Sequence, residues 1–124
     1  MSNKEEQKRI AKIRDLNDHL RQTFSGGTVL LSRGIRSKSP KELCDILERV
    51  KNFNDFNDGN DVYGEHDFGS FDYNGDTIFF KVDYYNNDDT YLSPDPSNPA
   101  HTHRVMTILL AEEYWLHTLK NTKG

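Results

Sequence analysis

The chain has 124 residues, of which 34% are hydrophobic, a formal net charge of −4 and a mean hydropathy of −0.87. This length fits a single domain over residues 1–124, and we expect flexible ends at 1–5 and 121–124. No apolar run reaches the roughly 18 residues that a membrane span needs, so the composition excludes a membrane-spanning helix. The only cysteine, Cys44, excludes an internal disulfide, and we expect a cytoplasmic location.

Charge is distributed unevenly along the chain. Residues 54–95 contain 11 acidic residues and one basic residue, Lys81, whereas residues 1–53 contain 12 basic and 7 acidic residues. Such an acidic stretch attracts a basic partner or a cation. The acidic balance also argues against direct binding of nucleic acid by the whole molecule, because phosphate contacts require a basic surface.

The first predicted element is an amphipathic helix over about residues 4–23. Its apolar residues recur at spacings of three and four, which places them on one helical face: Ile10, Ile13, Leu16, Leu20 and Phe24. Ser25-Gly26-Gly27 ends this helix. Residues 28–32 follow as a short apolar segment that is typical of a strand.

A second helix is predicted from the sequence Ser39-Pro40-Lys41-Glu42. Ser39 is a suitable N-cap, Pro40 suits the first turn, and Glu42 is placed to bond back to the cap. Cys44 lies next to Leu43 within this helix, which indicates packing and not an activated thiolate.

A hairpin is predicted after a polar loop at residues 53–64. Asn74-Gly75 is typical of a two-residue type I′ turn, here between strands at 67–73 and 76–85. With Tyr73 opposite Asp76, the register places Gly69 opposite Phe80, where it leaves room for the ring. The same register places His66 opposite Asp83 and predicts an ion pair between them.

The last predicted element is a helix that begins at Asn98-Pro99 and continues to about Leu119. Its apolar band is wide: Val105, Met106, Ile108, Leu109, Leu110, Trp115, Leu116 and Leu119. The resulting order is α-β-α-β-β-α. We therefore expect an α+β fold with a small antiparallel sheet, whose hairpin at 67–85 packs on the helices.

Aromatic rings and carboxylates are mixed at the end of the hairpin and in the loop that follows. Rings supply contact area and carboxylates mimic phosphates, so this mixture is typical of a surface that binds a basic protein. The predicted contact residues are Asp83, Tyr85, Asp88, Asp89, Tyr91 and Asp95.

Two other functions stay open. One is a metal-dependent enzyme centred on His66, because imidazole and carboxylate groups ligate divalent metals; its neighbouring ligands would be Glu65, Asp67 or Asp83. The other is a nucleic-acid binder that uses the bases around the start of the second helix: Arg33, Arg36, Lys38 and Lys41. No motif identifies a catalytic residue or a cofactor, so we expect none.

Five strings of sequence between Ile13 and Tyr114 resemble a known family. They are Leu16-Asn17-Asp18 with Leu20-Arg21, Gly64-Glu65-His66-Asp67-Phe68-Gly69, Lys81-Val82-Asp83-Tyr84-Tyr85, Ser93-Pro94-Asp95-Pro96 and Arg104-Val105-Met106-Thr107-Ile108-Leu109-Leu110-Ala111-Glu112-Glu113-Tyr114. The family is the uncharacterised bacterial domain of unknown function 3768, found mainly in alpha-proteobacteria, their plasmids and other mobile elements. The resemblance transfers no activity.

A mobile-element setting, as the resemblance implies, would suit an accessory or anti-defence protein. The leading hypothesis is therefore a small non-enzymatic module that binds a basic nucleic-acid-handling protein. Inhibitors of restriction or CRISPR machinery act in this way.

Overall fold

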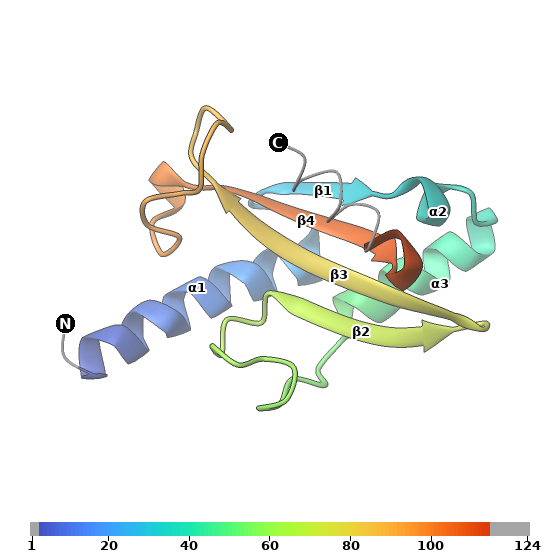
Figure 1. Ribbon diagram of the computed structural model, residues 1–124, viewed down its shortest axis with the longest axis horizontal. Helices are drawn as coiled ribbons and strands as arrows, with labels where there is room; N and C mark the ends of the chain where they lie inside the picture. The colour runs from blue at the N-terminus through green and yellow to red at the C-terminus, as the bar shows by residue number, and fades with distance from the viewer. Residues whose placement is uncertain (1–2, 115–124) are drawn as a thin grey trace.

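The chain forms one four-stranded mixed sheet packed against helices (Figure 1). The computed structural model describes residues 3–114. Its elements are α1 (Asn3–Thr23), β1 (Thr28–Leu31), α2 (Arg33–Arg36), α3 (Pro40–Lys51), β2 (Phe68–Tyr73), β3 (Asp76–Tyr85), the 3-10 helix η1 (Pro99–His101) and β4 (His103–Leu110). The strand order is β1-β4-β3-β2, with β1 parallel to β4 and the other pairs antiparallel. The predicted α+β class is confirmed.

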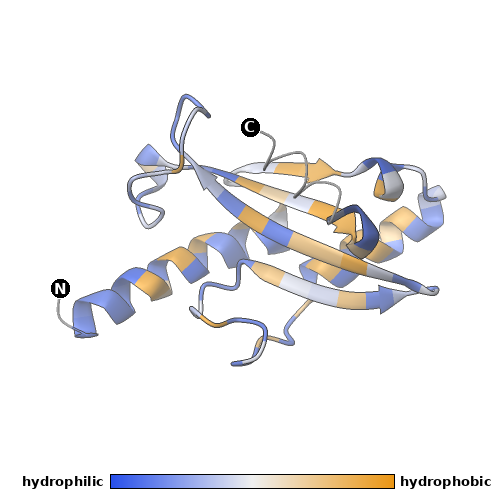
Figure 2. Ribbon diagram, viewed as in Figure 1, coloured by the Kyte–Doolittle hydropathy of each residue, from blue (hydrophilic) through white to orange (hydrophobic). Residues whose placement is uncertain are grey.

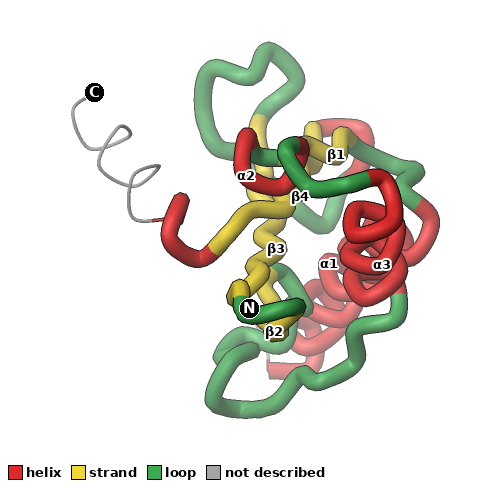
Figure 3. Tube along the Cα trace, turned by 90° about the vertical axis from the view of Figure 1, so that its right-hand side faces the viewer, coloured by secondary structure: helices red, strands yellow, loops and turns green. Residues whose placement is uncertain are grey.

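Helices α1 and α3 cover one face of the sheet, behind it in Figure 1 and to one side of it in Figure 3. The core lies between these layers and includes Leu20, Ile46, Val50, Ile78, Phe80, Met106 and Ile108. On the opposite face, a helical turn at 111–114 brings the ring of Tyr114 to 5.7 Å from the ring of Phe79. We call this opposite side the open face. Apolar and polar residues alternate over residues 80–83 of β3, where orange and blue alternate in Figure 2, because successive side chains point to the two faces.

The hairpin forms in the predicted register. Tyr73 pairs with Asp76 and Gly69 with Phe80, and Asn74 and Gly75 both have positive φ, as a type I′ turn requires. A Cβ atom on Gly69 would lie 2.2 Å from Cε2 of Phe80. Gly69 therefore makes room for the Phe80 ring, as the sequence predicts.

The first two predicted helices and the first strand are also confirmed. Helix α3 begins with the expected capping box, in which the Ser39 hydroxyl accepts from Glu42 N and the Glu42 side chain accepts from Ser39 N. The sequence analysis missed α2, a single turn capped by Ser32. Cys44 is exposed, so the packing predicted for its side chain was wrong. None of the helices in residues 3–114 is both long and apolar enough to cross a membrane.

The helix predicted from Asn98-Pro99 to about Leu119 was wrong up to residue 110, because residues 103–110 form the central strand β4, whereas residues 111–114 are helical. Asn98 does act as a cap, but it opens only the 3-10 helix η1. Strand β4 is paired on both edges and mostly buried, so its apolar residues run without alternation. Such a run has the same pattern in a buried strand and a buried helix. Trp115, Leu116 and Leu119 lie outside the described residues.

Candidate functional site

Three of the six predicted contact residues meet in a groove on the open face. Asp83 and Tyr85 come from β3 and Asp89 from the β3–β4 loop, and all three line this groove of about 460 Å³. Lys81 and His103 also line it, and Leu30 and Val105 supply apolar surface. Asp83, Tyr85 and Asp89 lie within six positions of one another in the sequence, and the structure brings their side chains together in this groove.

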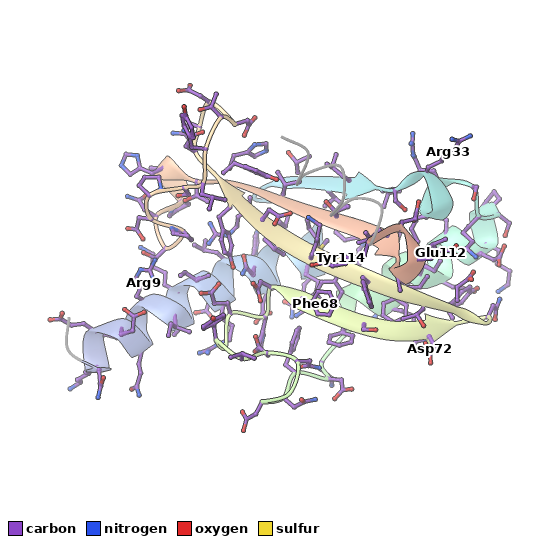
Figure 4. All side chains as sticks on the ribbon, in the orientation of Figure 1. Arg9, Arg33, Phe68, Asp72, Glu112 and Tyr114 are labelled. Atoms are coloured by element: carbon purple, nitrogen blue, oxygen red, sulfur yellow. The ribbon has the colours of Figure 1, made fainter. Side chains whose placement is uncertain are left out.

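Three of the four carboxylates of the predicted contact set already have a lysine, histidine or arginine neighbour within the chain. Lys81 pairs with Asp83, the His103 ring lies 2.6 Å from Asp89, and Arg9 of α1 (Figure 4) lies 3.7 Å from Asp95. The side-chain hydrogen bond from Ser97 outweighs burial and, with the Ser97 backbone N–H and the charge of Arg9, holds the pKa of Asp95 below its usual value. Asp95 therefore anchors the loop to α1 and does not line the groove.

The β3–β4 loop projects two large apolar side chains into solvent. Tyr91 is 76% exposed and Leu92 is 75% exposed. Backbone contacts hold this loop in place. Asn86 N donates to Tyr91 O at 2.8 Å, and Tyr85 and Leu92 form an isolated antiparallel β-bridge. Leu92 was not among the predicted contact residues. The signal available in the sequence was an isolated apolar residue inside a polar loop.

His66 does not pair with Asp83, so that prediction was wrong. Its Nδ1 lies 2.9 Å from Asp18 and its Nε2 lies 3.5 Å from Asp61, and its ring stacks on Phe56 at 3.8 Å between centroids. The expected partner Asp83 lies in the groove of the open face instead. His66 thus fastens the loop before β2 to helix α1.

The residues named for a metal centre have separate partners. Glu65 accepts from the Tyr84 hydroxyl at 2.8 Å, whereas Asp83 pairs with Lys81. Burial is the main reason that the pKa of Asp67 is raised, and the charges of Glu65, Asp61 and Asp83 add to it. Within residues 3–114, no three His, Cys, Asp or Glu side chains are grouped so that they could hold a metal ion.

A buried polar network joins α1 to the sheet. Asn17 is fully buried and donates from Nδ2 to Glu65 O at 3.0 Å and to the Tyr84 hydroxyl at 2.7 Å, while its Oδ1 accepts from Arg104 Nε at 2.9 Å. Burial raises the pKa of Tyr84 and lowers that of Arg104. The sequence analysis missed this network, although Asn17 falls on the apolar face of the helix at a spacing of four from Ile13.

Comparison with known proteins identifies the family. The family described as "Protein of unknown function (DUF3768)" matches residues 31–113, about two thirds of the 124 residues. The chain belongs to the DUF3768 family. The match covers four of the five strings that carry the resemblance, apart from Tyr114 at the end of the last one, but not the string at 16–21. No curated protein and no solved structure matches the chain.

The basic residues near the start of α3 in this DUF3768 protein are partly neutralised. Lys38 pairs with Asp76, and this hydrogen bond raises its pKa. Lys41 lies 3.0 Å from Asp45, whose hydrogen bond likewise raises the lysine pKa. The other two predicted nucleic-acid contacts, Arg33 and Arg36, are exposed on α2. The four bases therefore do not present four free charges to a phosphate backbone.

The same DUF3768 protein has an acidic groove between α3 and β2 that the sequence analysis missed. The groove has a volume of about 730 Å³, and the residues that line it include Asp45, Glu48, Asp55 and Asp72. The Asp72 side chain itself turns to the open face, where it accepts from the Thr77 hydroxyl. One basic residue, Arg49, also lines it. Asp45 and Glu48 belong to residues 1–53, where basic residues outnumber acidic ones. The distribution of charge along the sequence therefore gave no sign of the groove.

Proposed function

We propose that this DUF3768 protein is a non-enzymatic, cytoplasmic binding module that engages a basic, nucleic-acid-handling protein. Its contact surface, called the loop surface here, consists of Asp83, Tyr85, Asp88, Asp89, Tyr91 and Asp95. The observation that carries the proposal is the convergence of Asp83, Tyr85 and Asp89 in one groove, beside a loop that projects Tyr91 and Leu92. Large exposed rings inside a polar rim are the usual composition of a protein–protein interface.

The chemistry of the loop surface assigns different roles to its charges and its rings. Because Lys81, His103 and Arg9 already neighbour three of its carboxylates, a basic partner would exchange these contacts. Exchange between exposed ion pairs contributes little, about 0–1 kcal/mol for each pair. Tyr91 and Leu92 would then supply most of the affinity, while the carboxylates set orientation and salt dependence.

Anti-restriction or anti-CRISPR inhibition is the specific form of this proposal. The support for it is the acidic stretch at 54–95 together with the mobile-element setting expected from the family resemblance. Proteins that grip nucleic acid carry basic grooves. In such a groove the carboxylates of the loop surface would occupy phosphate positions, and the two apolar side chains would contact the groove wall.

The test uses the purified protein as bait in a lysate of its native host, at low and moderate salt. Three baits are compared: the wild type, Asp88→Lys with Asp89→Lys, and Asp15→Lys with Asp58→Lys. The last pair makes the same charge change at exposed sites away from the loop surface. We expect a basic nuclease or effector that the wild type and the Asp15/Asp58 variant retain, that salt releases, and that the Asp88/Asp89 variant loses. Equal retention by all three baits would reject the loop surface.

A further inference from the structure

Within residues 3–114, strand β2 has one edge that pairs with no other strand. It is the last strand in the order β1-β4-β3-β2, and in Figure 1 no strand lies on its outer side. Val82 N donates to Asp67 O, which defines a hydrogen-bonded pair at these positions. In antiparallel pairing such pairs alternate, so Phe68, Ser70 and Asp72 turn their backbone N–H and C=O groups away from β3. Outward groups of this kind are a template for one more strand.

The acidic groove runs along this free edge. Phe71 and Tyr73 of β2 line one side, and Asp45 and Glu48 of α3 line the other. A strand added beside β2 would point every second side chain into the groove, because side chains alternate between faces. Phe53 and Phe71 supply apolar surface there, against which the stem of a long side chain can pack.

The charge of the groove selects the occupant. Arg49 is the one basic residue that lines the groove; it lies 4.6 Å from the centre of the Phe71 ring and donates to Asp72 O. Asp45 accepts from Lys41 and from the Tyr73 hydroxyl, and the Asp72 carboxylate accepts from Thr77 on the open face. The acidic groups that the groove offers to an added strand are therefore the exposed Glu48 and Asp55. Pairing of two β2 edges would bring two such acidic grooves together, which like-charge repulsion disfavours. Lysine or arginine side chains on an added strand would instead meet carboxylates.

From these observations we infer that the β2 edge and the acidic groove bind an extended, lysine- or arginine-bearing segment of a partner protein by strand addition. Main-chain hydrogen bonds to Phe68 and Ser70 and to the Asp72 N–H provide affinity, since the Asp72 carbonyl already accepts from Arg49, and the carboxylates of the groove select basic side chains. This surface goes beyond the proposed function, because it shares no residue with the loop surface. Either surface can fail a test without the other.

The probe for this site is a dye-labelled peptide of alternating lysine and valine with blocked ends, titrated by fluorescence anisotropy. Two peptides of equal length serve as comparisons. One replaces lysine by glutamate; the other carries N-methyl groups on alternate residues, which keeps the charge and removes the backbone donors of one edge. We expect binding of the lysine peptide, no binding of the glutamate peptide, and affinity at least about tenfold lower for the methylated peptide.

Matched variants locate the site. Glu48→Lys with Asp55→Lys reverses two exposed charges in the groove, and Asp15→Lys with Glu112→Lys makes the same change elsewhere. We expect about a tenfold or greater loss of peptide affinity only in the groove variant. Ser70→Pro removes an outward N–H, which an edge strand tolerates, and it should weaken binding while Ser70→Ala does not. Hydrogen exchange should show peptide-induced protection at Ser70.

Several outcomes would overturn the inference. Equal affinity for the methylated and unmethylated lysine peptides would mean that charge alone attracts the probe, without an added strand. An unchanged affinity in the Glu48/Asp55 variant would place the peptide elsewhere, and its loss in Asp88→Lys with Asp89→Lys would place it on the loop surface. If the wild type is a dimer in solution and Ser70→Pro is a monomer, the β2 edge pairs with a second copy of the chain instead. Because the methylated peptide tests wild-type protein, the experiment stands even if Ser70→Pro fails to fold.

Discussion

The side-chain amide of Asn17 on α1 donates a 2.7 Å hydrogen bond to the hydroxyl of Tyr84 on β3, which lies 67 residues further along the chain. The same hydroxyl donates to Glu65, and Arg104 donates to Asn17 Oδ1. One fully buried amide thus connects a helix, the start of the hairpin and the central strand. Polar groups in such a place stabilise the fold only while every partner is satisfied.

Asn17→Ala should therefore destabilise the protein by about 3 kcal/mol, because it leaves Arg104 and the backbone carbonyl of Glu65 without their buried partner. Unfolding in urea measures the change, and Gln22→Ala, at an exposed position of the same helix, is the control. The effects of Asn17→Ala and Tyr84→Phe should not add in the double variant, because both remove the same bond. Additive effects would contradict the network.

The hairpin could be predicted from the sequence because its determinants are local. Asn74-Gly75 specifies the turn, the turn specifies the register, and the register places Gly69 against Phe80. Strand β4 could not be predicted in the same way, because an apolar run carries no period. Its strand conformation depends on β1 and β3, which lie far away in the sequence and pair with its two edges.

The candidate sites also differ in whether their residues are close together or far apart in the sequence. Asp83, Tyr85 and Asp89 are neighbours in the sequence and meet in one groove. The partners of His66 are Asp18 on α1 and Asp61 in the loop, and no local pattern connects α1 with the hairpin. The acidic groove joins α3 to the edge of β2, so it required the packing of helix on sheet to be known.

Gly69→Ala tests the contact that the hairpin register predicts. The added methyl group would overlap the Phe80 ring and lie 2.9 Å from Phe53, and both rings belong to the packed core or lie against it. Overpacking of this kind costs about 1–3 kcal/mol. Thermal unfolding should show the loss, whereas Gly59→Ala, in an exposed turn, should change little. Gly69→Ala with Phe80→Leu should recover part of the loss, and failure to do so would place the strain elsewhere.

Glu113→Gln tests the link between the turn at 111–114 and α2. The Glu113 carboxylate accepts from the Ser32 hydroxyl at 2.6 Å and from Gly34 N and Leu110 N, each at 2.9 Å. Burial opposes the charge of Glu113, but these three donors prevail and its pKa is lowered. We expect a loss of about 1–2 kcal/mol at neutral pH in the variant, because an amide provides one acceptor oxygen in place of two.

The pH dependence of the Glu113 effect follows from the lowered pKa. The ionised carboxylate stabilises the fold at pH values above the usual glutamate pKa, and this contribution disappears as the pH falls through the lowered pKa. The stability difference between wild type and Glu113→Gln should therefore vanish in acid. Glu112→Gln, at the exposed neighbour, is the control. A difference that stays constant in acid would mean that the carboxylate charge does not hold this turn.

Asp67→Asn should act in the opposite direction and stabilise the protein at neutral pH. Burial and the negative charges of Glu65, Asp61 and Asp83 raise the pKa of Asp67, so its ionised form is unfavourable in the folded state. Because the pKa of Asp67 is raised in the folded state, its protonated form stabilises the fold. This contribution to stability is complete below the usual aspartate pKa and is lost as the pH rises through the raised value. The gain from Asp67→Asn should thus be largest at neutral pH and shrink in acid. Asp58→Asn, exposed in the preceding loop, should give no such gain; a neutral-pH loss in Asp67→Asn would instead mean that the carboxylate has a favourable partner there.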